Sequence, residues 1–254
     1  MSSPANLVVL VTGANAGLGY YTARHLAVKG NYTVLVGARS VSKATDAIAK
    51  MKTEEPSIPA AALEPLEIDI TSDAGIAAAA EHVAKAHGRL DILINNAGIS
   101  GDAKRPLRTN FNDIFNTNVV GTAAVTDAFI PLLRKSTAPA PARRIVNVSS
   151  SVGSLAYAQV GRAVSNNYTA YAVSKTALNM LSLYTMHRLK EDKIAVVMTT
   201  PGYCGTALNK FQGHKDPADG ALNTVHAATM GSYDDMNGKF TEDLRGEKLD
   251  IVPF

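Results

Sequence analysis

LVVLVTGANAGLG, residues 7–19, joins a short apolar run to three closely spaced glycines. The run is rich in β-branched residues and is typical of a buried strand, and the segment from Leu18 to Lys29 is typical of a helix. Gly13, Gly17 and Gly19 would allow a tight turn, close approach of a ligand to the backbone and close helix packing. Free amides and the positive dipole end at the helix N-terminus favour a pyrophosphate. We therefore predict a dinucleotide site here, although such glycines can also close a turn that binds nothing.

The same alternation of apolar runs and helical segments continues along the chain. We predict strands at Leu7 to Thr12, Thr33 to Ala38, Leu66 to Asp69, Leu90 to Asn95, Arg144 to Val148 and Ile194 to Thr200. We predict helices at Leu18 to Lys29, Val41 to Lys52, Ser72 to His87, Phe111 to Lys135, Tyr168 to Lys190 and Pro217 to Met230. Strands this uniformly apolar suit a parallel sheet that helices cover on both faces. The sequence thus predicts an α/β protein: a three-layer, doubly wound parallel sheet (Rossmann fold) in a single dinucleotide-binding and catalytic domain, residues 1–254.

Composition and charge exclude several classes of protein. Hydrophobic residues make up 46% of the chain, enough for a sizeable core. The formal net charge is +3 and the basic residues are scattered, so we expect no nucleic-acid surface. Cys204 is the only cysteine and the histidines show no metal-ligand spacing, so we expect neither a disulfide nor a metal. The sequence shows no signal peptide or bilayer-spanning stretch, which predicts a soluble, unprocessed, cytoplasmic protein without a membrane partner.

Tyr171 and Lys175 lie four residues apart in the segment YAVSK, inside a predicted helix. Residues at this spacing share one helix face, so the phenol and the ammonium can meet a common target. A free tyrosine has a pKa near ~10, and a neighbouring ammonium favours its phenolate form. Such a pair also arises by chance on exposed helices. Its position after a predicted strand that ends in serines, IVNVSSSVG at residues 145–153, favours proton-transfer chemistry.

Together with the glycine spacing and the segment NNAG at residues 95–98, these motifs resemble the short-chain dehydrogenase/reductase family over nearly the whole chain. The resemblance implies that Asn118, Ser150, Tyr171 and Lys175 are catalytic. Tyr171 would exchange a proton with the substrate oxygen, and Ser150 would hydrogen-bond that oxygen. Lys175 would hold the nicotinamide ribose and lower the tyrosine pKa. Asn118 would lie at a helix kink that orders a water near the lysine.

Two of these assignments have neighbouring alternatives. Ser150 is favoured by counting from Gly153, but Ser149 and Ser151 adjoin it, and serines at a strand end can also simply cap the local backbone. Near Asn118, Asn112 and Asn116 are weaker candidates.

The resemblance also implies a set of cofactor contacts. They come from the glycine turn, the ends of the strands, the NNAG segment, the YAVSK helix and the turn PGYCGT: Gly13, Asn15, Ala16, Gly17, Leu18, Gly19, Arg39, Asp69, Ile70, Asn96, Ala97, Gly98, Tyr171, Lys175, Pro201, Gly202 and Thr206. Asp69 and Ile70 would bracket the adenine, and Thr206 would approach the nicotinamide amide. Asn95 would brace the sheet. As an alternative, Asp69 could cap the helix that follows it.

The end of the second predicted strand indicates which dinucleotide is used. An acidic residue there would bond a ribose 2′-hydroxyl, whereas a basic one would accept a 2′-phosphate, and this chain has Ala38 followed by Arg39. We therefore expect NADP(H), with NADPH preferred over NADH, unless Arg39 is only a solvated arginine. Many NADP-using relatives carry a second basic residue in the glycine turn. Here Asn15 and Ala16 occupy it, which leaves dual specificity open.

Two segments near the pocket depart from the family or vary within it. Tyr171 follows Ser150 by 21 residues, more than is usual, and the extra residues fall in SLAYAQVGRAVSNN. We expect this insert to form a pocket wall in which Leu155, Tyr157 and Val160 contact an apolar substrate, or else a surface loop. The residues after Thr206, as far as Asp216, are expected to form a mobile lid.

The sequence supports two hypotheses about function. The first is an enzyme that reduces a ketone or aldehyde substrate with NADPH, or oxidises the corresponding alcohol. The second is a catalytically idle, cofactor-sensing or scaffold protein of the same fold, against which the complete set of four catalytic residues argues. The helices at 111–135 and 168–190 carry more apolar surface than one sheet face needs, so we expect a homo-oligomer, a dimer or tetramer.

Overall fold

The computed structural model describes residues 6–102, 104–139, 142–162, 164–165, 168–242 and 250–254. The strands are β1 (Leu7–Val11), β2 (Tyr32–Ala38), β3 (Leu63–Glu67), β4 (Ile92–Asn95), β5 (Arg144–Val148), β6 (Ala195–Thr200), β7 (Phe240–Glu242) and β8 (Asp250–Ile251). The helices are α1 (Gly17–Val28), α2 (Val41–Glu54), α3 (Asp73–His87), α4 (Leu107–Phe115), α5 (Thr122–Arg134), α6 (Leu155–Gln159), α7 (Thr169–Arg188), α8 (Pro217–Thr229) and α9 (Tyr233–Met236). A π-helical turn, η1 (Asn116–Gly121), joins α4 to α5.

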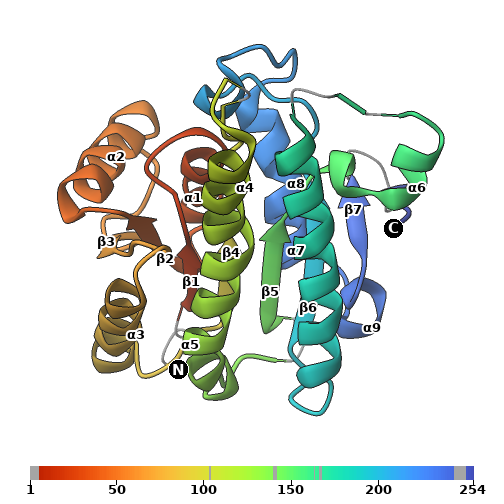
Figure 1. Cartoon of the computed structure of the whole chain (residues 1–254). Coiled ribbons are helices and arrows are strands. Elements are labelled where there is room, and N and C mark those ends of the chain that lie inside the picture. The colour runs from red at the N-terminus through yellow and green to blue at the C-terminus, as the bar shows by residue number, and fades with distance from the viewer. Residues whose placement is uncertain (1–5, 103, 140–141, 163, 166–167, 243–249) are drawn as a thin grey trace.

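The strands form one sheet in the order β3-β2-β1-β4-β5-β6-β7-β8. Each pair is parallel from β3 to β7, and only β8 is antiparallel. The order reverses direction at β1, so the chain winds outward first to β3 and then, from β4, to the other edge. Figure 1 shows α4, α5 and α7 in front of the sheet and α1 and α8 behind it. The predicted three-layer, doubly wound fold is confirmed.

Each face of the sheet carries its own apolar core. Along β1, Val9 and Val11 belong to the cluster that includes Leu26 of α1, while Val8 and Leu10 belong to the cluster that includes Phe129 of α5. Successive side chains of a strand point to opposite faces, so both faces of an entirely apolar strand can be buried. The sheet is thereby held rigid between two helical layers, and its carboxyl edge is a fixed platform.

Two of the predicted elements differ from the structure by more than two residues, and α6, α9 and β8 were not predicted. The third strand begins at Leu63 rather than Leu66 and ends before Asp69. It can include Pro65 because it is an edge strand, where no second neighbouring strand needs the amide that proline lacks. The single helix predicted from Phe111 to Lys135 begins earlier, at Leu107, and contains the π-helical turn η1. Such turns tend to occur at functional sites.

The insert between Ser150 and Tyr171 packs against the other end of the chain. Its helix α6 places Tyr157 against a small apolar cluster of Met198, Phe240 and Val252. The Ala156 amide donates to the Phe254 carbonyl at 3.1 Å. Figure 1 shows the C-terminus beside α6. Helix α6 of the insert is therefore anchored to the β7 edge.

Candidate active site

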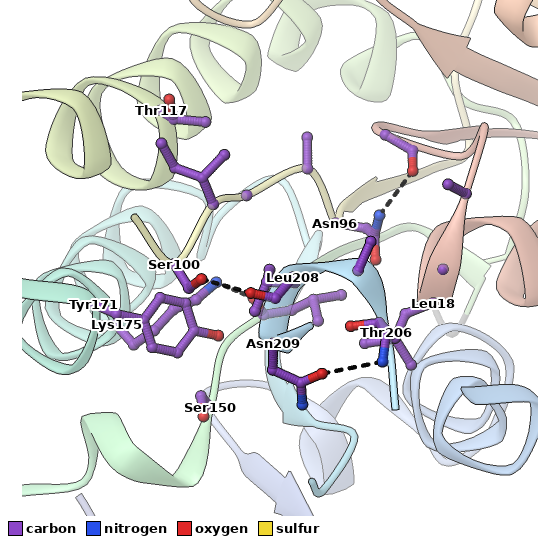
Figure 2. Close-up of a pocket in the computed structure, with 18 of the residues that line it drawn as sticks. Leu18, Asn96, Ser100, Thr117, Ser150, Tyr171, Lys175, Thr206, Leu208 and Asn209 are labelled. Atoms are coloured by element: carbon purple, nitrogen blue, oxygen red, sulfur yellow. Dashed lines mark hydrogen bonds between the residues drawn. The ribbon is translucent and has the colours of Figure 1, made fainter. Parts of the chain in front are cut away.

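A cavity of about 940 Å³ lies at the carboxyl ends of the strands, where the strand order reverses. Crevices at this position are the usual ligand sites of open α/β sheets. Its volume is near the upper end of the roughly 300–1,000 Å³ range of small-molecule pockets. Figure 2 shows a close-up of the residues that line it.

The glycine turn is shaped by its contact with the NNAG segment. Gly13 has a φ of 64°, and a Cβ there would lie 3.0 Å from the Ala97 Cα, so a side chain is excluded on both grounds. A Cβ on Gly19 would overlap the Asn96 side chain, whose Nδ2 donates to the Thr12 carbonyl at 2.8 Å. Gly17, with a φ of 57°, is the first residue of α1. The turn and the NNAG segment are thus packed as one unit.

This unit fits a dinucleotide diphosphate. The N-cap of α1, Ala16, has an extended backbone and no capping side-chain hydrogen bond, so no side chain occupies the helix N-terminus. Asn15, Ala16, Gly17 and Leu18 line the cavity there. Backbone amides and the helix dipole therefore point at open space of the kind that binds phosphate.

The adenosine end of the cavity is formed by the ends of β2 and β3. Ala38, Arg39, Asp69 and Ile70 line it. Asp69 Oδ1 accepts hydrogen bonds from the Thr71 amide (2.9 Å) and hydroxyl (2.7 Å), and these bonds lower the carboxyl pKa. The N-cap of α3 is Ser72, which accepts from the Gly75 amide, so Asp69 does not cap that helix. Arg39 is exposed and makes no hydrogen bond or ion pair with another described residue.

Asparagines at the end of β4 and in η1 hold the floor of the site. Asn95 donates to Thr126 (3.0 Å) and to Asn147 on the neighbouring β5 (2.9 Å), which is the bracing expected of it. Asn118 is buried in η1, where it accepts from the Ile99 amide (2.9 Å) and donates to the Ile99 carbonyl (2.8 Å). The chain segment after β4 is therefore fixed to the helix layer.

Tyr171 and Lys175 lie on one face of α7 and point into the cavity (Figure 2). The Lys175 side chain is only 4% exposed, and its Nζ donates to the Val148 carbonyl at 2.8 Å. It lies 5.5 Å from the centre of the Tyr171 ring. Burial lowers the pKa of Lys175 to about 8 and raises the pKa of Tyr171 to about 12, the latter opposed in part by a hydrogen bond with Ser150. The phenol is therefore protonated at neutral pH, and the prediction that Lys175 lowers its pKa is wrong, because burial outweighs any effect of the lysine.

Of the three adjacent serines, Ser150 is the one that faces this phenol. The Ser149 hydroxyl points away, donating to Asn179 at 2.6 Å. Ser151 begins a short 3-10 turn, and its amide donates to Thr200. The structure thus places Ser150 beside the tyrosine, as the count from Gly153 predicts.

The turn after β6 covers the cavity. Pro201, Gly202 and Thr206 line it, and Thr206 lies against the glycine turn, 3.7 Å from where a Cβ on Gly17 would be. Thr206 and Asn209 form a reciprocal capping box. The Ser100 hydroxyl reaches across from the segment after β4 and donates to the Leu208 carbonyl at 2.6 Å (Figure 2).

Comparison with known proteins assigns this architecture to a family. A family model described as short chain dehydrogenase matches residues 7–217. The chain belongs to the short-chain dehydrogenase/reductase family. It is accordingly an oxidoreductase of that family, and carbonyl reductases are among its relatives.

Individual relatives cover nearly the whole dehydrogenase. It is 42% identical to the short-chain dehydrogenase anuI of Penicillium roqueforti, over 96% of each chain. It is 27% identical to carbonyl reductase (NADPH) 1 of Bos taurus, over 96% of this chain and 98% of that one. The crystal structure of an NADPH-bound carbonyl reductase from chicken fatty liver shares the fold, with a TM-score of 0.80, 24% identity and coverage of 100% and 96%.

In the described part of the insert, the three residues predicted to form a pocket wall do not do so. Leu155 and Val160 are exposed, and Tyr157 packs into the β7 edge, so none of the three lines the cavity. The prediction failed for Tyr157 because a neighbouring element can bury an apolar side chain of a loop, whereas Leu155 and Val160 lie at the surface, as the surface-loop alternative predicts. Val152 and Tyr168, which flank the insert, line the cavity instead.

Sequence reasoning also missed Ser100, Tyr203, Leu208 and Asn209, which line the cavity. Ser100 and Leu208 are 108 positions apart, so no local pattern could pair them. Among the described residues the dehydrogenase has no cluster of side chains suited to a metal ion. Within the same ranges, none of its helices has the length and apolar character needed to cross a bilayer.

Proposed function

We propose that this protein reduces a ketone or aldehyde to the alcohol with NADPH. The observation that carries the proposal is the convergence of Ser150, Tyr171 and Lys175 at one end of a cavity whose other end exposes a phosphate cradle and Arg39. Hydride would be supplied by the bound cofactor. The names of relatives that are carbonyl reductases support the same reaction.

The protein's own residues would manage the proton and the developing charge. Tyr171 would donate its proton to the carbonyl oxygen, and a pKa held high by burial keeps that proton in place at neutral pH. Ser150 would hydrogen-bond the same oxygen. Lys175, within reach of the phenol and of the ribose site, would stabilise the phenolate as it forms. Asn118 would position this group by fixing the segment after β4 to η1.

Arg39 supports NADPH over NADH. Its guanidinium lines the cavity with no carboxylate at the end of β2 to repel a 2′-phosphate. The remaining cofactor contacts would be those of the glycine turn, the NNAG segment, Asp69, Ile70 and Thr206.

Calorimetric titration with NADPH and NADH, followed by a carbonyl screen that monitors NADPH oxidation, tests the proposal. We expect tighter binding of NADPH. Arg39→Ala should weaken NADPH binding about ten- to a hundredfold with little effect on NADH, whereas Lys43→Ala on the neighbouring helix should change neither. Tighter NADH binding would overturn the cofactor preference. Binding without turnover of any carbonyl compound would favour a cofactor-sensing or scaffold role.

We also propose that the single domain, residues 1–254, is cytoplasmic and forms a homo-oligomer, a dimer or tetramer, through its helical layer. Val173, Met180 and Tyr184 form an exposed apolar stripe along α7, and Val120 of η1 is also exposed. A monomeric mass in light scattering would contradict the oligomer, and cell fractionation tests the location.

A further inference from the structure

The two ends of the cavity differ sharply in charge. Arg39 and Asp69 line the end formed by β2 and β3. Of the other charged residues that line the cavity, Asp113 is paired with Arg105 at 2.6 Å, and the Lys175 Nζ is held by the Val148 carbonyl. Every other described residue around Ser150 and Tyr171 that lines the cavity is neutral: Ser100, Val152, Tyr168, Tyr203 and Leu208.

Aromatic and aliphatic surface dominates this neutral end. Tyr168 precedes Tyr171 by almost one helical turn and lines the cavity with it. Tyr203 lines the cavity from the turn after β6, with its ring 5.8 Å from that of His214. Leu208 is 41% exposed and is held in place by the bond from Ser100 to its carbonyl. These side chains present apolar area that a bound molecule would cover.

Two cations of neighbouring segments do not line this end. Lys215 lies against Gly202, with its Nζ 3.7 Å from where a Cβ on that glycine would be. Arg162 stacks on the Tyr157 ring at 4.0 Å, on the α6 side. Lys175 is therefore the one described cation that lines this end, and a carboxylate or phosphate bound beside Tyr168 and Tyr203 would give up water for mostly apolar surface, which is unfavourable.

We propose that the substrate is an uncharged carbonyl compound with a flat aromatic body that packs between Tyr168, Tyr203 and Leu208. This inference rests on the proposed carbonyl reduction. In that step the C=O π bond breaks, a C–H bond forms with hydride from NADPH, which leaves NADP⁺, and an O–H bond forms with the Tyr171 proton, which solvent restores. Aromatic faces favour aromatic ligands through offset and edge contacts. Keto acids and carbonyl phosphates are disfavoured.

Matched probes test the charge and the shape separately. The whole protein with NADPH is assayed with acetophenone, 4-acetylbenzoate and cyclohexyl methyl ketone. We expect kcat/KM for acetophenone to exceed that for 4-acetylbenzoate at least tenfold, and that for the non-aromatic ketone about threefold. Equal or better turnover of 4-acetylbenzoate would overturn the neutral substrate, and equal turnover of cyclohexyl methyl ketone would overturn the aromatic one.

A variant can reduce the preference. Leu208→Lys adds an ammonium to the cavity wall, and we expect the ratio of kcat/KM between acetophenone and 4-acetylbenzoate to fall at least fivefold. Phe211→Lys is the matched control, because Phe211 belongs to the same segment, is 71% exposed and does not line the cavity. An equal change in both variants would show that bulk charge, and not the cavity wall, sets the preference.

Failure of the proposed function gives a different result. If no ketone is turned over, carbonyl reduction is overturned, and the ligand preference is then measured directly. The protein saturated with NADP⁺ is titrated by calorimetry with 1-phenylethanol and with 4-(1-hydroxyethyl)benzoate. At least tenfold tighter binding of 1-phenylethanol supports a neutral aromatic site. Similar affinities, tighter binding of the benzoate or no binding of either would overturn it.

Discussion

The sheet has an amino edge, where its parallel strands begin, and a carboxyl edge, where they end. Both bury charged side chains, but the hydrogen-bond partners of these side chains differ. At the amino edge, Asp91 beside β4 is 0% exposed and accepts from the Val8 amide at 2.8 Å, from Arg89 and from Ser136. At the carboxyl edge, Lys175 is almost as deeply buried, but it has one carbonyl partner and faces an open cavity.

Arg144 shows the same pattern as Asp91. It begins β5 at the amino edge, is fully buried, and donates to carbonyls at the end of α8, including that of Ala227 at 2.9 Å. Burial lowers its pKa to about 10, so it remains charged at neutral pH. The cation also complements the negative end of the helix dipole. A buried charge with several partners stabilises the fold, whereas one with spare capacity beside a cavity is available for chemistry.

The largest effect should come from the carboxyl edge. Tyr171→Phe removes the proton donor while keeping the ring, so we expect kcat to fall about 10²- to 10⁴-fold with the free energy of unfolding and NADPH binding little changed. Steady-state kinetics measures kcat, and calorimetry measures unfolding and NADPH binding. Tyr157→Phe, which keeps its ring against the β7 edge and outside the cavity, is the control and should retain kcat. An equal loss of kcat in both variants would show that the Tyr171 hydroxyl has no special role in the reaction.

At the amino edge the effect should be on stability. Asp91→Ala leaves the Val8 amide, Arg89 and Ser136 without their acceptor, so we expect the free energy of unfolding to fall by about 3–5 kcal/mol. Urea denaturation measures it, with the exposed Asp46→Ala as the control. The folded variant should keep its kcat. A variant that kept its full free energy of unfolding but lost activity would show that Asp91 serves catalysis and not stability.

The pH dependence of reduction should sharpen the contrast. Lys175 has its pKa lowered to about 8, so its ammonium is lost above that pH, whereas Tyr171, with a pKa near 12, stays protonated. We expect kcat at saturating NADPH to be constant near pH 7 and to fall about tenfold per pH unit above 8. A flat profile to pH 10 would argue against a role for the lysine charge.

The smallest effect is expected for Arg188, a charged residue on the helical surface that lies at neither edge of the sheet. Arg188 on α7 donates to Asp127 on α5 at 2.6 Å, but both side chains are more than half exposed. Arg188→Ala should change the free energy of unfolding by about 0–1 kcal/mol and leave kcat unchanged. Thermal unfolding and the standard assay would show it. A loss comparable to that of Asp91→Ala would mean that burial does not separate these charges.

Local signals in the sequence were sufficient where one segment makes the feature by itself. The strand and glycine turn at residues 7–19 specify their own geometry, and the four-residue spacing of Tyr171 and Lys175 places both on one helix face. Local signals failed where distant segments meet. The insert carries apolar residues, as a pocket wall would, yet its Tyr157 packs against Phe240 and Val252.

The sequence by itself determined the doubly wound fold, the phosphate cradle and the order of the site motifs, because these depend on hydrophobic period, on glycine conformation and on spacing along one element. Only the tertiary structure decided that Ser150, and not Ser149, faces the phenol, that Ser100 reaches Leu208, and that Tyr168, Tyr203 and Leu208 line one cavity. Those features arise from contacts between segments far apart in the chain, and burial then sets the partners and pKa of each group.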